Sequence, residues 1–354
     1  MVQPIKGRGT ALRPPGRFES RDSVRVDDGW GTIEEELPEF RTIVTAERAK
    51  SIISRNDSPD IGFDQSINPY KGCEHGCIYC YARPSHAYLN LSPGLDFETR
   101  LFYKPNAAEL LDQELRKPGY RVSPIMLGAN TDPYQPIERK LEVTRSILQV
   151  LARFRHPVGI TTKGAMVERD LDLLADLARD RLAGVGITLT TLDAELKRTL
   201  EPRASSPQAR LRVIRKLSAA GVPVRVMFSP VIPFVNDAEL ERVLEAAAEA
   251  GASTASYVLL RLPYELKGLF REWLETHLPL RAAHVMSLIN QSREGRDYQS
   301  GFGSRMRGTG QFAELIAKRF ALARRRYGLD RPGRGLDPDL FRVPAAAGDQ
   351  MGLF

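Results

Sequence analysis

Short apolar segments alternate with longer amphipathic segments through the middle of the chain. The short segments are expected to be strands and span residues 63–68, 124–129, 158–162, 184–190, 224–229 and 256–261. The longer segments have helical periodicity and span residues 107–117, 137–154, 167–181, 207–220 and 237–250. Gly221 and Gly251 follow two of these helices, where glycine is favoured as a C-cap. This alternation predicts βα units joined into a parallel sheet.

Six strands are too few to close a (β/α)8 barrel. We therefore expect an α/β fold with a partial (β/α)6 TIM-like barrel; a doubly wound sheet has the same local pattern and is the alternative. Further helices are expected over 264–278, 280–289 and 311–327, with an Arg- and Gly-rich loop over 290–310. The expected parts are a flexible basic extension (1–40), the partial barrel (41–265), a helical C-terminal segment (266–330) and a flexible linker (331–354).

Chemistry in both of these folds takes place at the carboxyl ends of the strands. Polar residues follow four of the expected strands: Asn130, Thr131 and Asp132 the second, Lys163 the third, Thr190 the fourth and Ser229 the fifth. Because the carboxyl ends of parallel strands meet at one edge, we expect these residues to share a binding site.

All three cysteines lie in one loop after the first expected strand, as Cys73, Cys77 and Cys80. With no cysteine elsewhere, they cannot form a disulfide framework. Three thiolates can converge on one metal centre, and a site with one protein ligand missing leaves a position for a substrate or cofactor. We interpret the loop as binding a [4Fe–4S] cluster with one open iron. The alternative is a Cys3His zinc site completed by His75 or His86.

The cysteine motif, with the aromatic Tyr79 before the third cysteine, resembles that of the radical S-adenosylmethionine (SAM) superfamily. In that family three cysteines hold a [4Fe–4S] cluster and SAM occupies the open iron. Reduction of the cluster cleaves SAM to a 5′-deoxyadenosyl radical. The resemblance implies a radical SAM enzyme that uses both cofactors and a flavodoxin- or ferredoxin-type electron donor.

Three further motifs are similar to those of the spore-photolyase-like branch, often described as DNA repair photolyase-like. They are Asn-Pro-Tyr-Lys-Gly-Cys at 68–73, Asn-Thr-Asp-Pro-Tyr-Gln-Pro at 130–136 and Glu-Pro-Arg at 201–203. The resemblance implies that the cofactor-binding residues include Tyr79, Asn130, Thr131, Asp132, Lys163, Thr190, Arg203 and Ser229. Glu201 and Arg203 are a candidate ion pair. Two alternatives stay open: 130–136 is a proline-fixed turn, and the pair of Glu201 and Arg203 only braces the loop.

One feature departs from spore photolyase, which carries an additional cysteine that returns hydrogen to the repaired thymine. This chain has no fourth cysteine, so repair by that route is not expected. If a protein residue closes the radical cycle, a tyrosine is the next candidate, and Tyr257 and Tyr264 are the candidate catalytic residues.

The formal net charge is +7, and much of it lies near the C-terminus. Residues 316–334 hold one anion, Asp330, and these cations: Lys318, Arg319, Arg324, Arg325, Arg326, Arg331 and Arg334. Such a segment suits nucleic acid, although a solvated helix end has the same composition. The last five residues, Gln350 to Phe354, resemble the peptide by which bacterial repair proteins dock on the sliding clamp. DNA and the clamp are therefore candidate partners.

The N-terminal residues have no apolar signal-peptide core, and no stretch approaches the roughly 20 apolar residues of a membrane span. Three clustered cysteines fit a reducing compartment, so we expect a cytoplasmic protein. The leading hypothesis is a radical SAM enzyme acting on nucleic acid in a repair role. The alternatives are a peptide, tRNA or small-molecule substrate, or a non-catalytic cluster- or zinc-binding protein associated with DNA.

Overall fold

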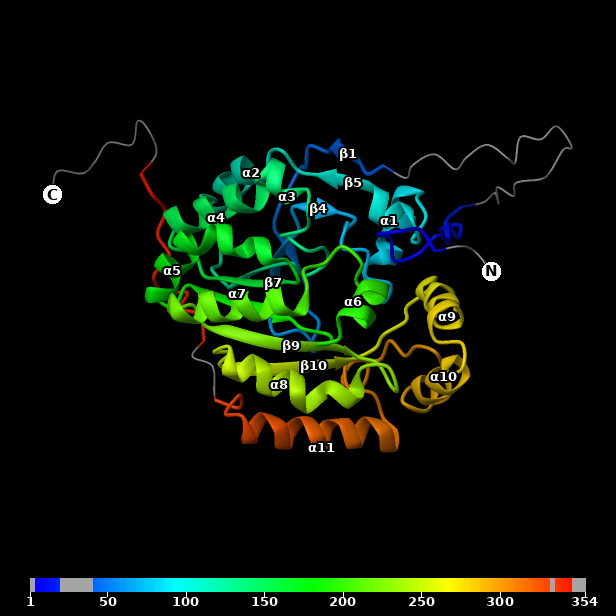
Figure 1. Ribbon diagram of the computed structural model, residues 1–354. Coiled ribbons are helices and arrows are strands. Elements are labelled where there is room, and N and C mark those ends of the chain that lie inside the picture. The colour runs from blue at the N-terminus through cyan, green and yellow to red at the C-terminus, as the bar shows by residue number, and fades with distance from the viewer. Residues whose placement is uncertain (1–3, 20–40, 332–334, 346–354) are drawn as a thin grey trace, which may run out of the picture.

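The computed structural model describes residues 4–19, 41–331 and 335–345 (Figure 1). Its main sheet has seven strands in the order β10-β9-β8-β7-β6-β3-β2. Their bounds are β2 Ser54–Arg55, β3 Gln65–Ile67, β6 Ile125–Leu127, β7 Val158–Thr162, β8 Ala183–Thr188, β9 Val224–Val231 and β10 Thr254–Leu259. Six strands pair in parallel, and β2 pairs antiparallel with β3. The strands follow one another in chain order, without the reversal of a doubly wound sheet, and β10 and β2 form two open edges. This order confirms the partial barrel.

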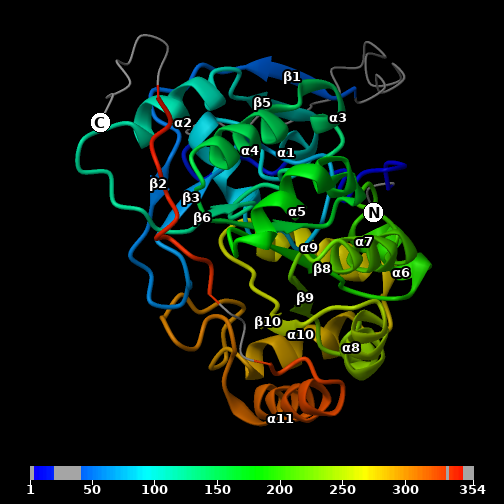
Figure 2. The ribbon, with the colours of Figure 1, turned by 90° about the vertical axis from the view of Figure 1, so that its left-hand side faces the viewer.

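Helices cover the outer face of this sheet (Figures 1 and 2). They are α2 Ala107–Leu115, α4 Val143–Arg153, α5 Leu171–Arg179, α7 Pro207–Ala219 and α8 Leu240–Glu249. Each has an amphipathic sequence, and its apolar side chains join those of the strands in one core. Ile147 of α4 and Ile160 of β7 are examples, each at most 1% exposed. Burial of this apolar surface is the main force that holds helices to sheet.

Glycines and methionines determine how the inside of the barrel is filled. A Cβ at Gly159 would lie 2.9 Å from the Met126 methyl carbon, and one at Gly186 would lie 3.1 Å from the Met227 sulfur. The Thr161 hydroxyl lies 3.8 Å from both sulfurs. Two methionines therefore fill the interior because the neighbouring strands carry no side chain at these positions.

The helix predicted over 137–154 is interrupted. Glu142 adopts a left-handed conformation with φ of 51° and separates α3 Glu138–Leu141 from α4. The buried Glu138 carboxylate accepts hydrogen bonds from the backbone N–H groups of Thr144 (3.0 Å) and Arg145 (3.4 Å), which are otherwise unpaired at the start of α4. The helices predicted over 167–181 and 237–250 begin with 3₁₀ turns, η2 Ala165–Asp170 and η3 Asp237–Glu239.

A small second sheet, absent from the predictions, has strands before and after the cysteine loop in the chain. Its strands are β1 Ile43–Ala46, β5 Arg100–Tyr103 and β4 Tyr70–Lys71, in the order β1-β5-β4. Two short helices lie between β4 and β5, η1 Arg83–Leu89 and α1 Asp96–Thr99. These strands are two to four residues long, too short for an apolar alternation to reveal them.

The predicted C-terminal helices are present as α9 Leu266–His277, α10 Ala282–Gln291 and α11 Gly310–Arg326. The segment between α10 and α11 contains turns and no helix or strand. A further helix, α6 Ala194–Leu200, was not predicted. Trp273 of α9 is buried, and its indole N–H donates to the Thr199 carbonyl at 3.1 Å, which joins α9 to α6.

Parts of both expected flexible ends pack against the barrel. Residues 4–19 lie beside the cysteine loop, at the end of the barrel where the strands finish, whereas residues 335–345 cross the opposite end (Figures 1 and 2). There the Asp337 N–H donates to Arg181 O (3.0 Å) and the Arg342 N–H to Phe154 O (2.9 Å). The predicted linker over 331–354 is thus partly a packed segment. The clamp-like peptide, Gln350 to Phe354, lies outside the described residues. No described helix has the length and apolar character needed to cross a membrane.

His156 makes stability dependent on pH. Burial lowers the pKa of this histidine from 6.5 to about 4, so between these values the unfolded chain binds a proton that the folded chain does not. The contribution of His156 to stability is therefore fully present above pH 6.5 and is lost as the pH drops toward 4, by about 3 kcal/mol. Denaturant titrations across this range measure the effect. A His156→Gln variant should lose most of this pH dependence, and an unchanged profile in the variant would contradict the assignment.

Candidate active site

The cysteine loop, residues 73–80, is held by backbone hydrogen bonds from distant parts of the chain. The Cys73 N–H donates to Phe97 O at 2.9 Å, and the Ile78 N–H donates to Leu200 O at 3.0 Å. All three thiols are free; Cys73 and Cys77 are buried and Cys80 is half-buried. The loop is therefore tied to two other segments of the chain, and the third cysteine is its least buried one.

A buried ion pair lies against the cysteine loop and holds its backbone in place. Arg83 and Glu98 are both fully buried and pair with each other. Arg83 also donates to the carbonyls of Cys77 (2.9 Å) and Gly76 (3.1 Å). Glu98 accepts the Gly9 N–H at 2.9 Å. A Cβ at position 9 would lie 1.8 Å from Gly76 O, so only glycine allows the N-terminal segment this close to the loop.

The donors at the loop suit an iron–sulfur cluster. Burial raises the pKa of the Cys77 thiol to about 12 and that of Cys73 well above its usual value. Such thiols stay protonated on their own, but binding of a metal deprotonates them. Thiolates are the usual ligands of iron–sulfur clusters. The three free thiols therefore fit the cluster.

The two histidines of the zinc alternative have other neighbours. The Nε2 atom of His86 lies 2.9 Å from the Arg100 carbonyl oxygen, and the Nδ1 atom of His75 lies 3.3 Å from Asp132. In the described part of the chain, no three His, Cys, Asp or Glu side chains gather as a site for a single metal ion.

Tyr79 and Thr190 converge on one buried carboxylate, Glu201. The Tyr79 hydroxyl donates to Glu201 and lies 3.2 Å from the Thr190 hydroxyl, which donates to Glu201 at 2.7 Å. Arg210, also buried, pairs with the same carboxylate. Burial alone would raise the pKa of Glu201, but Arg210 and Lys163 lower it to about 2. Arg203 was the predicted partner of Glu201, but the Arg203 guanidinium pairs instead with the Glu74 carboxylate, at 3.2 Å.

The Asp132 carboxylate organises the turn after β6. It accepts hydrogen bonds from the Thr162 hydroxyl (2.6 Å), the Lys163 N–H (2.8 Å) and the Tyr134 N–H (2.9 Å). Burial opposes its ionisation, but His75 and these donors hold the pKa of Asp132 well below its usual range. Asp132 therefore links the ends of β6 and β7, which is the role it has if residues 130–136 form a proline-fixed turn.

The Thr131 side chain is also engaged within the fold, because its hydroxyl donates to Tyr70 O at 2.8 Å. By contrast, three predicted side chains at the strand ends make no hydrogen bond to any described residue. They are the Asn130 amide, the Lys163 ammonium and the Ser229 hydroxyl, after β6, after β7 and on β9. The Lys163 ammonium lies 5.7 Å from the centre of the Tyr79 ring, so it faces the cysteine loop.

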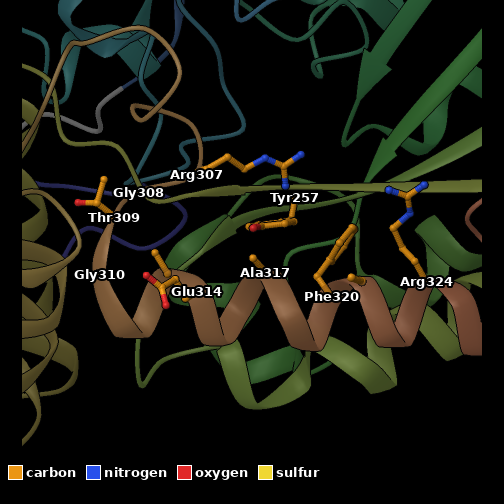
Figure 3. Close-up of a pocket in the computed structure, with 11 residues that line it drawn as sticks. Tyr257, Arg307, Gly308, Thr309, Gly310, Glu314, Ala317, Phe320 and Arg324 are labelled. Carbon is orange, nitrogen blue, oxygen red and sulfur yellow. The ribbon is translucent and has the colours of Figure 1, made fainter.

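Neither predicted catalytic tyrosine is brought to the loop. Tyr257 lies on β10 and points toward α11, where its ring centre is 4.6 Å from that of Phe320 (Figure 3). Tyr264 is 62% exposed and contacts the N-terminal segment, since the Arg17 guanidinium lies 4.2 Å from its ring centre.

Three residues that the sequence reasoning missed form a group that begins at the end of the cysteine loop: Tyr81, Arg261 and Tyr298. Tyr81 follows Cys80 directly, is 47% exposed and donates its hydroxyl to Ala129 O. The Arg261 guanidinium lies 5.6 Å from the Tyr81 ring centre and donates to the Tyr298 hydroxyl at 3.3 Å. Its Nε atom is buried without a hydrogen-bond partner, and no described carboxylate pairs with it. Arg261 follows the last strand. The rule that site residues lie at the carboxyl ends of the strands (the strand-end rule) could therefore have found it.

Proteins of similar sequence come from bacteria and archaea. An uncharacterized protein of Mycobacterium tuberculosis is 40% identical over 214 residues, which are 60% of this chain and 63% of that protein. One of Methanocaldococcus jannaschii is 28% identical over 232 residues, 66% of this chain and 82% of that protein. The chain thus matches less than two thirds of the length of its mycobacterial relatives.

Spore photoproduct lyase complexed with dinucleoside spore photoproduct has a similar fold. Its TM-score is 0.58 at 13% identity, over 80% of this chain and 79% of the lyase. A point mutant of the lyase gives the same TM-score. The family model of the Radical SAM superfamily matches residues 67–247, just over half of the chain, and this family uses a [4Fe–4S] cluster and SAM. With the cysteine loop at the mouth of an open (β/α)6 barrel, the match establishes that the chain belongs to the radical SAM superfamily.

Proposed function

We propose that Cys73, Cys77 and Cys80 hold the [4Fe–4S] cluster and that the enzyme acts on nucleic acid. The observation that carries the proposal is the combination at the barrel mouth. Three free thiols lie in one loop, and an arginine without a carboxylate partner among the described residues lies between two tyrosines, one of which directly follows the third cysteine. Three thiolates leave one iron open for SAM.

The three unengaged groups at the strand ends are the proposed SAM contacts. The amide oxygen of Asn130 suits the amino group of SAM, the Lys163 ammonium suits its carboxylate, and the Ser229 hydroxyl adds a further donor. When bound, the cluster and SAM supply a 5′-deoxyadenosyl radical that abstracts hydrogen from the substrate.

Other predicted residues act indirectly in this proposal. Asp132 fixes the backbone of Lys163, while Glu201 holds Tyr79 and Thr190 in one orientation. Arg203 pairs with Glu74 of the cysteine loop and steadies it. These residues keep the site in a single arrangement, which a radical reaction needs to exclude water and side reactions.

Arg261, Tyr81 and Tyr298 are the proposed substrate contacts. A buried guanidinium N–H without an acceptor is costly, and a phosphate oxygen would satisfy it. Tyrosine rings offer stacking surfaces to unpaired bases. A structural neighbour, spore photoproduct lyase, has been solved in complex with a dinucleoside spore photoproduct. We therefore propose DNA as the substrate class, without the cysteine-dependent route, and Tyr81 in place of Tyr257 and Tyr264 as the tyrosine nearest the reaction. A flavodoxin- or ferredoxin-type protein is the proposed electron donor.

The Arg261→Gln variant tests the substrate class. It should weaken binding of a single-stranded oligonucleotide about tenfold and lower the salt dependence by about one phosphate contact. Fluorescence anisotropy across a salt series measures both. Arg242→Gln is the matched control, because Arg242 is exposed on α8 and forms no ion pair among the described residues. Equal effects of the two substitutions, or no binding by the unmodified protein, would favour a peptide or small-molecule substrate instead.

A further inference from the structure

A groove with a cavity volume of about 540 Å³ lies between β10 and α11, on the outer side of the barrel. Tyr257 of β10 and Phe320 of α11 form its apolar wall, and Arg307 and Arg324 extend over their rings (Figure 3). Glu314 lies toward the other end of the groove. The volume is within the range of small-molecule sites and is large enough for a nucleotide.

The two arginines of the groove have no described carboxylate partner. The Arg307 guanidinium lies 4.2 Å from the Tyr257 ring centre, and that of Arg324 lies 5.9 Å from the Phe320 ring centre. Arg319, on the same helix, differs because it pairs with Glu241 at 2.6 Å. The Nε atom of Arg324 is buried and makes no hydrogen bond to any described residue. Because an unmade hydrogen bond at a buried charged group is costly, the groove favours an anionic oxygen.

The aromatic rings form the apolar wall of the groove and are not open to stacking bases. Tyr257 and Phe320 are 4% and 3% exposed, and their ring centres are 4.6 Å apart. The groove therefore offers its two cations to an anion, and the phosphodiester backbone is the part of a nucleic acid that it suits.

The groove is joined to the barrel mouth through one residue. Met306 precedes Arg307, accepts the Leu259 N–H at 2.9 Å, and has its sulfur 3.5 Å from an Arg261 nitrogen. The buried Arg293 holds this part of the chain in place by donating to Leu260 O at 2.7 Å. Met306 thus contacts Arg261 through its sulfur and precedes Arg307 in the chain, so both arginines lie next to one anchored residue.

We propose that this groove, lined by Arg307, Arg324, Tyr257 and Phe320, binds the phosphodiester backbone of the substrate strand away from the reacting nucleotide. This rests on the proposed function, since it assumes that the substrate at the mouth is a nucleic acid. A strand bound at Arg261 would continue past Arg307 to Arg324. The groove would add affinity for long substrates and leave the reacting position unchanged.

The test compares two double variants with equal loss of charge. Arg307→Gln/Arg324→Gln removes the groove cations. Arg325→Gln/Arg326→Gln removes two exposed cations of α11 that do not line the groove. Binding of a fluorescent single-stranded oligonucleotide of about 12 nucleotides is measured by anisotropy across a salt series. The groove variant should lower the salt slope by about 1.4, because each phosphate contact on a single strand contributes about 0.7. The control should change it by clearly less.

A second comparison separates this site from the mouth. A dinucleotide has a single internal phosphodiester, which Arg261 at the mouth would bind. The groove variant should therefore bind it as tightly as the unmodified protein does, whereas Arg261→Gln should weaken its binding. Equal slopes for the two double variants, or weakened dinucleotide binding in the groove variant, would overturn the proposal. If the unmodified protein binds neither probe, the nucleic-acid substrate itself fails. Formation of 5′-deoxyadenosine without substrate should be the same in both double variants, which shows that the barrel is intact.

Discussion

Replacing any one of Cys73, Cys77 and Cys80 by alanine is expected to lower 5′-deoxyadenosine formation by at least about a thousandfold. With only three thiolates available, the loss of one leaves two protein ligands, and the cluster is no longer held. Anaerobic reconstitution followed by iron and sulfide analysis measures the cluster directly, and addition of dithionite and SAM measures the chemistry. Both quantities should fall together in all three variants.

His75→Asn and His86→Asn are the matched controls for this experiment. In the Cys3His zinc alternative one of these histidines is the fourth ligand, so its loss would release the metal. In the proposed site, both variants should keep the iron and sulfide content of the unmodified protein. A cysteine variant with full iron content, or a histidine variant that loses its metal, would contradict the assignment of the loop.

The second large effect is expected at Glu201. Its carboxylate and the Arg210 guanidinium are at most 2% exposed, so Glu201→Gln leaves a buried charge without its partner. The free energy of unfolding should fall by about 3–5 kcal/mol, because removing one member of a buried ion pair leaves the desolvation cost of the other. Denaturant titration measures the loss. Glu195→Gln is the control; this carboxylate is 86% exposed and pairs with Arg198 at the surface, so its loss should have no measurable effect.

The double variant Glu201→Gln/Arg210→Met makes the test specific. Since it removes both charges, it should recover a large part of the stability lost in the single variant. In addition, the folded pKa of Glu201, about 2, lies below the unfolded value of 4.5. The contribution of the pair is therefore present above pH 4.5 and is lost as the pH falls toward 2. A loss below about 1 kcal/mol in the single variant, or no recovery in the double variant, would contradict this role.

Local patterns predicted the barrel well, because strand and helix periodicity and the order of elements are encoded in neighbouring residues. The break at Glu142 was missed because its cause is the buried Glu138 carboxylate, which also pairs with Arg169, a residue 31 positions away. Amphipathic periodicity continues across this break, so only the three-dimensional contact reveals it. Packing of residues 4–19 against the loop depends likewise on Gly9 and Glu98, which lie 89 positions apart.

The site was predicted in outline for the same reason. The strand-end rule placed Asn130, Lys163 and Ser229 at the end of the barrel that holds the cysteine loop. It could not show that the Asp132 carboxylate is already occupied by the turn, or that Glu201 pairs with Arg210. For Tyr257 the strand was right, but alternation along β10 directs this side chain outward to α11 (Figure 3).

Removal of hydrogen from nucleic acid is the central proposal for this member of the radical SAM superfamily. The most direct test incubates the reconstituted, reduced enzyme and SAM with single-stranded oligonucleotides, undamaged or ultraviolet-treated, that carry deuterium on the sugars and bases. The predicted result is deuterium in the 5′-deoxyadenosine, or in SAM if the cofactor is regenerated. Formation of 5′-deoxyadenosine without any deuterium from these oligonucleotides, in protein with a full cluster, would contradict the proposal.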